Sequence, residues 1–179
     1  MIVVSDSTLL ITLMKAARID LLHDLFGVII IPEAVYQELT INSNFPDEAK
    51  TIQESKFIRI VRVEDRKTVS VLQRATGLDL GESEAIVYAD DNHADILLMD
   101  EASGRRVALD MGIEIMGSVG VLVTAFKGGY ISVSEAEDAF RKIRSAKRHI
   151  SERLISDALD IIHNTKKEIF RHRGIASKS

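Results

Sequence analysis

The chain has 179 residues, of which 46% are hydrophobic and 28% charged, and its formal net charge is −4. This size and composition are typical of one globular domain that could carry a helical appendage. Because the chain has no cysteine, disulfides and zinc–thiolate sites are excluded. No apolar run reaches the roughly 20 residues of a membrane helix. We therefore expect a cytoplasmic protein with no membrane partner.

Short apolar runs alternate along the chain with amphipathic segments. The predicted strands are Ile2–Ser5, Val28–Ile31, Phe57–Val63 (with one wet face), Ile96–Met99 and Ile113–Met116. The predicted helices are Ser7–Ile19, a turn at Leu21–Phe26, Glu33–Leu39 with Pro32 in its first turn, Pro46–Ser55 after a loop at Asn42–Phe45, Asp65–Ala75, Glu82–His93, Glu101–Met111 and Ser118–Phe126. Strands that alternate with helices indicate an α/β domain with a central parallel sheet.

Two further helices are predicted near the C-terminus, one from Ser132 or Ser134 to about Ala146 and one from about Ser151 to about Arg173. Residues 127–179 carry 12 Lys and Arg against 7 Asp and Glu, whereas residues 1–126 carry 11 against 20. An acidic body therefore bears a basic C-terminal section. We divide the chain into a domain at 1–131 and a helical extension at 132–179, and we expect about the last five residues to be frayed.

The last predicted helix carries an apolar stripe. Its members are Leu154, Ile155, Ala158, Ile161, Ile162, Ile169 and Phe170. Three roles stay open for it: packing on its own domain, a dimer seam, or a binding face for another protein.

Four acidic residues stand where the pattern expects apolar side chains or strand ends. Asp6 and Asp100 each follow an apolar run, and ligands of open α/β sheets bind outside the carboxyl ends of the strands. Glu38 shares a helical face with core-type residues, and so does Glu82. Each also has a structural alternative, because Asp6 or Asp100 could cap the following helix and Glu38 could lie at the edge of the core.

Glu82 and Glu84 compete for the third position. Glu82 shares the apolar stripe of its helix and lies 18 residues before Asp100, whereas Glu84 is expected on a solvated flank. Glu84 and Glu101 remain secondary candidates.

Several inward carboxylates repel one another until a cation enters. Hard divalent ions such as Mg²⁺ take oxygen ligands, lower the pKa of a bound water and stabilise the charge that develops on a phosphodiester. The pattern therefore predicts a site for one or two such ions.

The ordered set of motifs resembles the PIN domain, a family of metal-dependent nucleases. The motifs are Val4-Ser5-Asp6-Ser7, Val35-Tyr36-Gln37-Glu38-Leu39, Gly81-Glu82-Ser83-Glu84-Ala85-Ile86, Leu97-Leu98-Met99-Asp100-Glu101 and Gly104-Arg105-Arg106-Val107-Ala108. The resemblance covers about residues 1–126. It implies a three-layer α/β/α fold with a central parallel sheet, and acidic residues that converge around Mg²⁺ or Mn²⁺.

The resemblance also implies roles. By position, Asp6, Glu82 and Asp100 would hold the metal ion, and Glu38 would ligate the ion or orient a water bound to it. The implied function is that of a Mg²⁺- or Mn²⁺-dependent endoribonuclease, the toxin of a toxin–antitoxin pair. Its implied partners are RNA, an antitoxin protein and a second copy of the chain, and the basic C-terminal helices could guide RNA to the acidic site.

The chain departs from the family pattern in three ways. Glu82 stands where Asp is usual, Leu98 replaces the usual Thr or Ser, and the C-terminal region is longer than that of a minimal toxin. These departures keep open the alternative of a non-catalytic PIN-like module that binds RNA or a protein. A phosphatase-like enzyme with Asp6 as nucleophile is a third possibility, although the second Asp that such sites place two residues further on is missing.

Overall fold

The computed structural model describes the backbone of residues 1–41, 46–146 and 150–176, and the side chains of this set as far as residue 166. Its strands are β1 (Val3–Ser5), β2 (Ile29–Pro32), β3 (Ile58–Val61), β4 (Ile96–Leu98) and β5 (Ile115–Met116). All pairings between them are parallel, and the sheet order is β3-β2-β1-β4-β5. The predicted α/β class with a central parallel sheet is confirmed.

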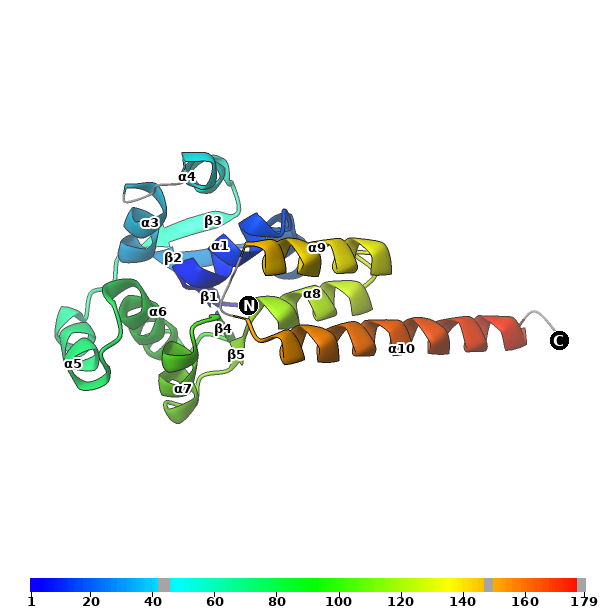
Figure 1. Ribbon diagram of the computed structural model, residues 1–179. Coiled ribbons are helices and arrows are strands. Elements are labelled where there is room, and N and C mark those ends of the chain that lie inside the picture. Colours follow the sequence, from blue (N-terminus) through cyan, green and yellow to red (C-terminus); the bar gives the residue numbers. More distant parts are fainter. Residues whose placement is uncertain (42–45, 147–149, 177–179) are drawn as a thin grey trace.

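Helices cover both faces of this sheet (Figure 1). They are α1 (Ser7–Lys15), α2 (Asp20–Phe26), α3 (Glu33–Thr40), α4 (Pro46–Glu54), α5 (Arg66–Thr76), α6 (Leu80–Asp91), α7 (Ala102–Asp110), α8 (Ser118–Lys127), α9 (Val133–Ser145) and α10 (Glu152–Ala176).

The alternation of side chains along the strands explains the three layers. In β1, Val3 packs into an apolar cluster with residues of α1, α8, α9 and α10, whereas Val4 packs into a second cluster with residues of α6 and α7. In β4, Leu98 joins the first cluster and Leu97 the second. Successive side chains of a strand point to opposite faces, so each strand contributes to both cores. The three-layer α/β/α architecture is thereby confirmed.

The strand order places a topological switch point next to β1. The chain adds β2 and β3 on one side of β1 and then adds β4 and β5 on the other. Connections therefore leave the carboxyl ends of β1 and β4 in opposite directions, and the crevice between them is the usual ligand site of such sheets. Asp6 and Asp100 each follow one of these two strands.

Several boundaries differ from the prediction. The helix that begins at Ser7 ends at Lys15, and Ala17 then has a φ of 55°, a left-handed conformation that a continuing helix does not allow. Pro32 belongs to β2 and precedes α3, so its predicted place in the first helical turn is wrong. The predicted loop at Asn42–Phe45 lies outside the described residues.

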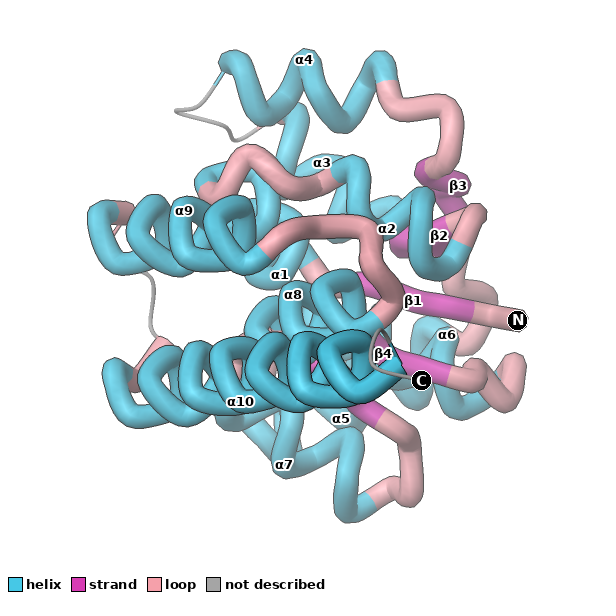
Figure 2. Tube along the Cα trace, turned by 90° about the vertical axis from the view of Figure 1, so that its right-hand side faces the viewer, coloured by secondary structure: helices cyan, strands magenta, loops and turns pink. Residues whose placement is uncertain are grey.

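The two C-terminal helices pack on the body. Ser132 rather than Ser134 begins α9, through a capping box with Glu135. Phe140 of α9 and Ile155 of α10 are buried in the cluster on the α8 side of the sheet, and Figure 2 shows α8, α9 and α10 side by side. The division at residue 131 stays a prediction. None of the helices in the described part of the chain has both the length and the apolar character that crossing a bilayer requires.

Candidate active site

Asp6 is a buried carboxylate at the end of β1. Its Oδ1 accepts a hydrogen bond from the backbone N–H of Leu9 (2.9 Å) and its Oδ2 accepts one from the Thr8 hydroxyl (2.5 Å), so it caps α1. Only 1% of the residue is exposed. Burial raises the pKa of Asp6 to about 7 against the effect of these hydrogen bonds, and the charges of Asp100 and Glu82 raise it further. The helix-cap interpretation of Asp6 is therefore confirmed, and its role as a metal ligand stays a prediction.

Asp100 follows β4 and holds the start of α8. Its Oδ1 accepts a hydrogen bond from the backbone N–H of Ser118 (2.8 Å), so it caps a helix 18 residues further on and not the helix that follows it. A Cβ at Gly117 would lie 3.1 Å from this Oδ1, which explains why glycine fits there. Among the described residues, no donor reaches the buried Oδ2 of Asp100. A buried carboxylate oxygen without a donor is costly, and a cation can remove that cost.

Glu82 lies in the first turn of α6 and takes part in a capping box. Its Oε2 accepts a hydrogen bond from the backbone N–H of Asp79 (3.0 Å), and its own N–H donates to Asp79 Oδ1 (2.8 Å). Burial raises the pKa of Glu82, and the negative charges of Asp79 and Glu101 act in the same direction. Its Oε1 points toward α7, where a Cβ on Gly104 would lie 3.6 Å away.

Glu38 reaches the same region from α3. A Cβ on Gly81 would lie only 2.5 Å from Glu38 Oε1, so the absence of a side chain on α6 lets this carboxylate approach the helix. Burial raises the pKa of Glu38, and the charges of Asp79 and Glu82 add to the rise. Hydrogen bonds from the Ser7 hydroxyl and the Gly81 backbone counteract it.

Glu84 has a different role from Glu82. It is 1% exposed, so the predicted solvated position is wrong. Its Oε2 accepts a hydrogen bond from the backbone N–H of Ala34 (3.1 Å), and its Oε1 is paired with Arg66. Glu84 therefore links α6 to the first turn of α3 and to α5. Glu101, the other secondary candidate, accepts a hydrogen bond from the Ser103 hydroxyl (3.3 Å).

The four main candidates thus come from β1, α3, α6 and the end of β4, and their charges act on one another. Within the described side chains, however, no three Asp, Glu or His residues lie close enough to share one metal ion. The donor chemistry fits a hard divalent cation, because it consists of carboxylate oxygens, one of them without a hydrogen bond. A shared ion would require these side chains to rotate toward it.

A cavity of about 820 Å³ lies beside Asp100, between α7, α8 and α10. Arg105 and Arg106 line it near Asp100, and the remainder is lined mainly by apolar residues, together with the carboxylates of Asp110 and Asp157. Arg105 Nη1 donates to the carbonyl oxygen of Met99 (2.8 Å), which holds its guanidinium at the site. Two cationic side chains are therefore available next to the carboxylates.

Sequence reasoning missed two contributors to the site. Asp79 could have been found, because Asp79-Leu80-Gly81-Glu82 has the spacing of a capping box. The contact between Asp100 and Ser118 has no local signal, since it depends on the pairing of β4 with β5.

Comparison with known families gives one finding. A family model described as a PIN domain matches residues 2–164. Comparison with the curated proteins and with the solved structures gives no match. The matched segment contains all five strands and all four main carboxylates, and it continues into α10.

Proposed function

The chain belongs to the PIN-domain family, and we propose that within this family it is an endoribonuclease that depends on Mg²⁺ or Mn²⁺. PIN domains have a nuclease-type fold and typically use divalent metal ions. The observation that supports the proposal is the pair Asp6 and Asp100 at the switch point of the sheet, where one carboxylate has its pKa raised to about 7 and the other has a buried oxygen without a donor.

Three carboxylates are the proposed ligands: Asp6, Glu82 and Asp100. The bound ion would supply a water of lowered pKa and would offset the negative charge that develops on the phosphate. Two hydrogen bonds fix the carboxylate of Asp6 at the end of β1, so only the lone pairs that these bonds leave free could bind a metal ion. Glu82 is fixed in the same way through one oxygen.

Glu38 is the proposed residue that orients the attacking water. It is partly exposed, and Ser7 and Gly81 hold its carboxylate, so it can accept a hydrogen bond from a water molecule beside the three ligands. Arg105 and Arg106 would contact the phosphates that flank the cleaved bond, because guanidinium groups pair well with phosphate oxygens. They offset the repulsion between RNA and an acidic site.

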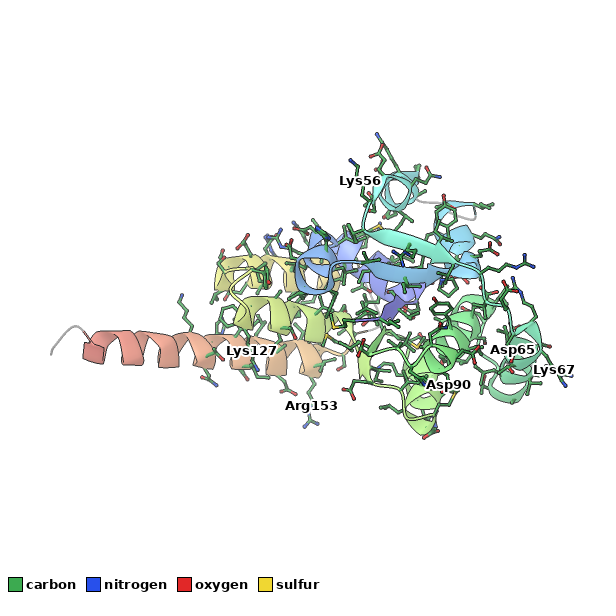
Figure 3. All side chains as sticks on the ribbon, turned by 180° about the vertical axis from the view of Figure 1, so that it is seen from behind. Lys56, Asp65, Lys67, Asp90, Lys127 and Arg153 are labelled. Atoms are coloured by element: carbon green, nitrogen blue, oxygen red, sulfur yellow. The ribbon has the colours of Figure 1, made fainter. Side chains whose placement is uncertain are left out.

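Cleavage of a single-stranded RNA and of a hairpin RNA tests the proposal. Wild type should cut in Mn²⁺ and not in EDTA, whereas Asp100→Asn should lose about two orders of magnitude or more in rate. Asn keeps an acceptor for the Ser118 N–H, so the fold should persist. The matched control is Asp90→Asn, because Asp90 is an exposed residue of α6 about two turns after Glu82 (Figure 3). Cleavage in EDTA, or full activity of Asp100→Asn, would refute the mechanism.

A non-catalytic module that binds RNA or a protein is the second candidate. It is favoured by the finding that no three carboxylates among the described side chains lie within reach of one ion. Calorimetric titration with Mn²⁺, followed by RNA binding with and without the ion, separates the two functions. RNA binding that does not respond to the ion, without cleavage, supports the second candidate.

Two finer parts of the function stay predictions from the family resemblance. These are the role of toxin in a toxin–antitoxin pair, with an antitoxin as partner, and a homodimeric state. Induced expression tests the first: wild type should arrest growth and Asp100→Asn should not. Equal growth of both strains would remove the toxin role while leaving the nuclease proposal to be decided by the cleavage assay.

A further inference from the structure

Ser118 is the first residue of α8, and its hydroxyl group has no hydrogen-bond partner among the described residues. The residue is 0% exposed. A serine at the start of a helix usually occupies the N-cap, where its hydroxyl accepts a hydrogen bond from the helix backbone. In α8 the N-cap is Gly117, so Ser118 stands one residue too late for that role. The usual structural reason for a serine at this point of a helix is therefore missing.

A second buried oxygen without a partner belongs to the carboxylate that holds Ser118. The Ser118 N–H donates to Asp100 Oδ1 (2.8 Å), whereas no donor in the described part of the chain reaches Asp100 Oδ2. The Ser118 hydroxyl is only a few covalent bonds from this N–H, and Oδ2 shares its carbon atom with Oδ1. The two oxygens without partners therefore lie on groups that one hydrogen bond already brings together.

The surrounding contacts keep the start of α8 close to Asp100. A Cβ on Gly117 would lie 3.0 Å from Arg105 Nη1 and 3.1 Å from Asp100 Oδ1, so a larger residue would push the helix away. Arg105 Nη1 also donates to the Met99 carbonyl oxygen (2.8 Å), which fixes the backbone just before Asp100. The pairing of β4 with β5 positions the segments that carry Asp100 and Ser118. The two residues are thus held together by the sheet and by the backbone around them.

Two buried oxygens without donors indicate an occupant that binds both. A hydroxyl or carboxylate oxygen that is buried without a hydrogen bond is costly, because it has given up its contacts with water. A hard divalent cation would remove this cost, since carboxylate and serine hydroxyl oxygens are both among its ligands. Such an ion also needs further donors here, because no three Asp, Glu or His residues among the described side chains lie within reach of one ion.

We propose that the Ser118 hydroxyl is a ligand of the metal ion, beside Asp100 Oδ2. This role rests on the proposed metal site of Asp6, Glu82 and Asp100, and it adds to that site a neutral oxygen from α8. A neutral ligand completes the coordination of an ion without adding to the repulsion between the carboxylates. Ser118 then acts twice, because its N–H holds one oxygen of Asp100 while its hydroxyl binds the ion that the other oxygen binds.

A trapped water molecule is the other occupant that would satisfy both oxygens. The two occupants predict different results when the hydroxyl is removed. If a water molecule is held there, Ser118→Ala loses the same stability with and without metal, and its affinity for the metal ion does not change. If the ion is held there, the affinity falls and the metal-free protein is not destabilised.

Calorimetric titration of the full-length chain with Mn²⁺ tests the ligand role. Ser118→Ala should bind Mn²⁺ about tenfold more weakly than wild type. In EDTA it should unfold at the same or a higher urea concentration, because the backbone N–H still holds Asp100 and a buried hydroxyl without a partner is gone.

Ser83→Ala is the matched control for this titration. Ser83 is also 0% exposed, and its hydroxyl also lacks a partner among the described residues. It lies one turn before Val87 on the same face of α6, and Val87 packs with Val69 of α5. Its hydroxyl is therefore expected on the side of α6 that faces α5, and Ser83→Ala should bind Mn²⁺ as tightly as wild type.

Ser118→Cys gives a spectroscopic test of direct contact with the ion. The chain has no cysteine, so this variant carries a single thiol. A thiolate prefers softer ions to Mn²⁺, and a thiolate bound to Co²⁺ absorbs strongly in the near ultraviolet through charge transfer. This band should appear when Co²⁺ is added to Ser118→Cys and should be absent for wild type and for Ser83→Cys. A Co²⁺ complex of Ser118→Cys that forms without the band overturns the proposal.

The titration of wild type separates a failure of this role from a failure of the proposed function. If wild type binds Mn²⁺ and Ser118→Ala binds it equally well, Ser118 is not a ligand, while the site of three carboxylates stands. If wild type binds no Mn²⁺, both proposals fail. An equal loss of stability of Ser118→Ala in EDTA and in Mn²⁺ assigns the hydroxyl to a trapped water molecule and also overturns the proposal.

Discussion

The backbone N–H of Asp6 donates to the carbonyl oxygen of Leu98 over 3.1 Å. This hydrogen bond continues the pairing of Ser5 with Leu98 past the end of β1. Because Asp100 follows Leu98 by two residues, the sheet itself sets how close the two carboxylates are. Their repulsion is therefore a fixed property of the fold, and it can be measured without any nuclease assay.

Replacing Asp6 by Asn should stabilise the metal-free protein at alkaline pH. The folded pKa of Asp6, about 7, lies above its unfolded value of 3.8. The wild type therefore has its full free energy of unfolding at a pH below the unfolded pKa of Asp6. It loses part of this free energy as pH rises through the folded pKa, because the buried carboxyl group must then ionise. At about pH 8 the variant should gain up to about 4 kcal/mol over wild type in EDTA, and the gain should disappear toward pH 4.

Urea unfolding across this pH range measures the difference, with the surface change Asp90→Asn as control. A gain that is the same at every pH would mean that the charge of Asp6 is not its source.

Divalent metal should stabilise the wild type and fail to stabilise the site variants. An ion that binds only the folded state adds about 3 kcal/mol at a hundredfold excess over its dissociation constant. Thermal unfolding with and without Mn²⁺ should show this gain for wild type and lose most of it for Asp100→Asn. The metal site would have to lie elsewhere if Asp100→Asn were stabilised as much as wild type.

Removing the Glu84 side chain should cost stability rather than catalytic chemistry. Glu84→Ala leaves the Ala34 N–H without its acceptor and Arg66 without its buried partner, so we expect a loss of about 2 kcal/mol in unfolding free energy. Glu84→Gln keeps the acceptor and should cost about 1 kcal/mol, because Arg66 is half exposed and screened by solvent. Glu33→Gln, whose carboxylate lies 3.9 Å from the same Arg66 at the surface, is the control and should change stability little. Equal losses for Glu33→Gln and Glu84→Ala would contradict the assigned role.

A methyl group on Gly81 should impair Glu38 while the fold persists. The added Cβ would lie 2.5 Å from Glu38 Oε1, and this carboxylate is the mobile end of a long side chain, so it can move away. Ala also favours a helix over Gly by about 1 kcal/mol. We expect Gly81→Ala to unfold at the same or a higher urea concentration than wild type and to cleave RNA about tenfold more slowly.

A double-mutant cycle locates the cause of this effect. In the background of Glu38→Gln, the further change Gly81→Ala should give no additional loss of cleavage if Gly81 acts through Glu38. Independent losses that add would assign Gly81 a different role.

Local sequence patterns were enough to predict the architecture, whereas contacts between residues distant in sequence limited the prediction of the site. The apolar runs that became β1, β2 and β4 were recognisable because they are buried on both faces, as in parallel sheets. The predicted solvated flank for Glu84 failed because its ion pair with Arg66 joins α6 to another helix. The hydrogen bond from Ser118 to Asp100 could not be predicted from the sequence either, since it forms only when β4 pairs with β5.

The position of β1 in the sheet also constrains when the site can form. β1 is synthesised before the other described strands of the sheet and lies at its centre, but its second neighbour, β4, ends only at Leu98. Contacts between residues so far apart in sequence form late, because the intervening chain must first be closed into a loop. A nascent chain that has not yet reached β4 therefore has Asp6 but no site, and any cleavage activity must await the synthesis of β4 and of Asp100 behind it.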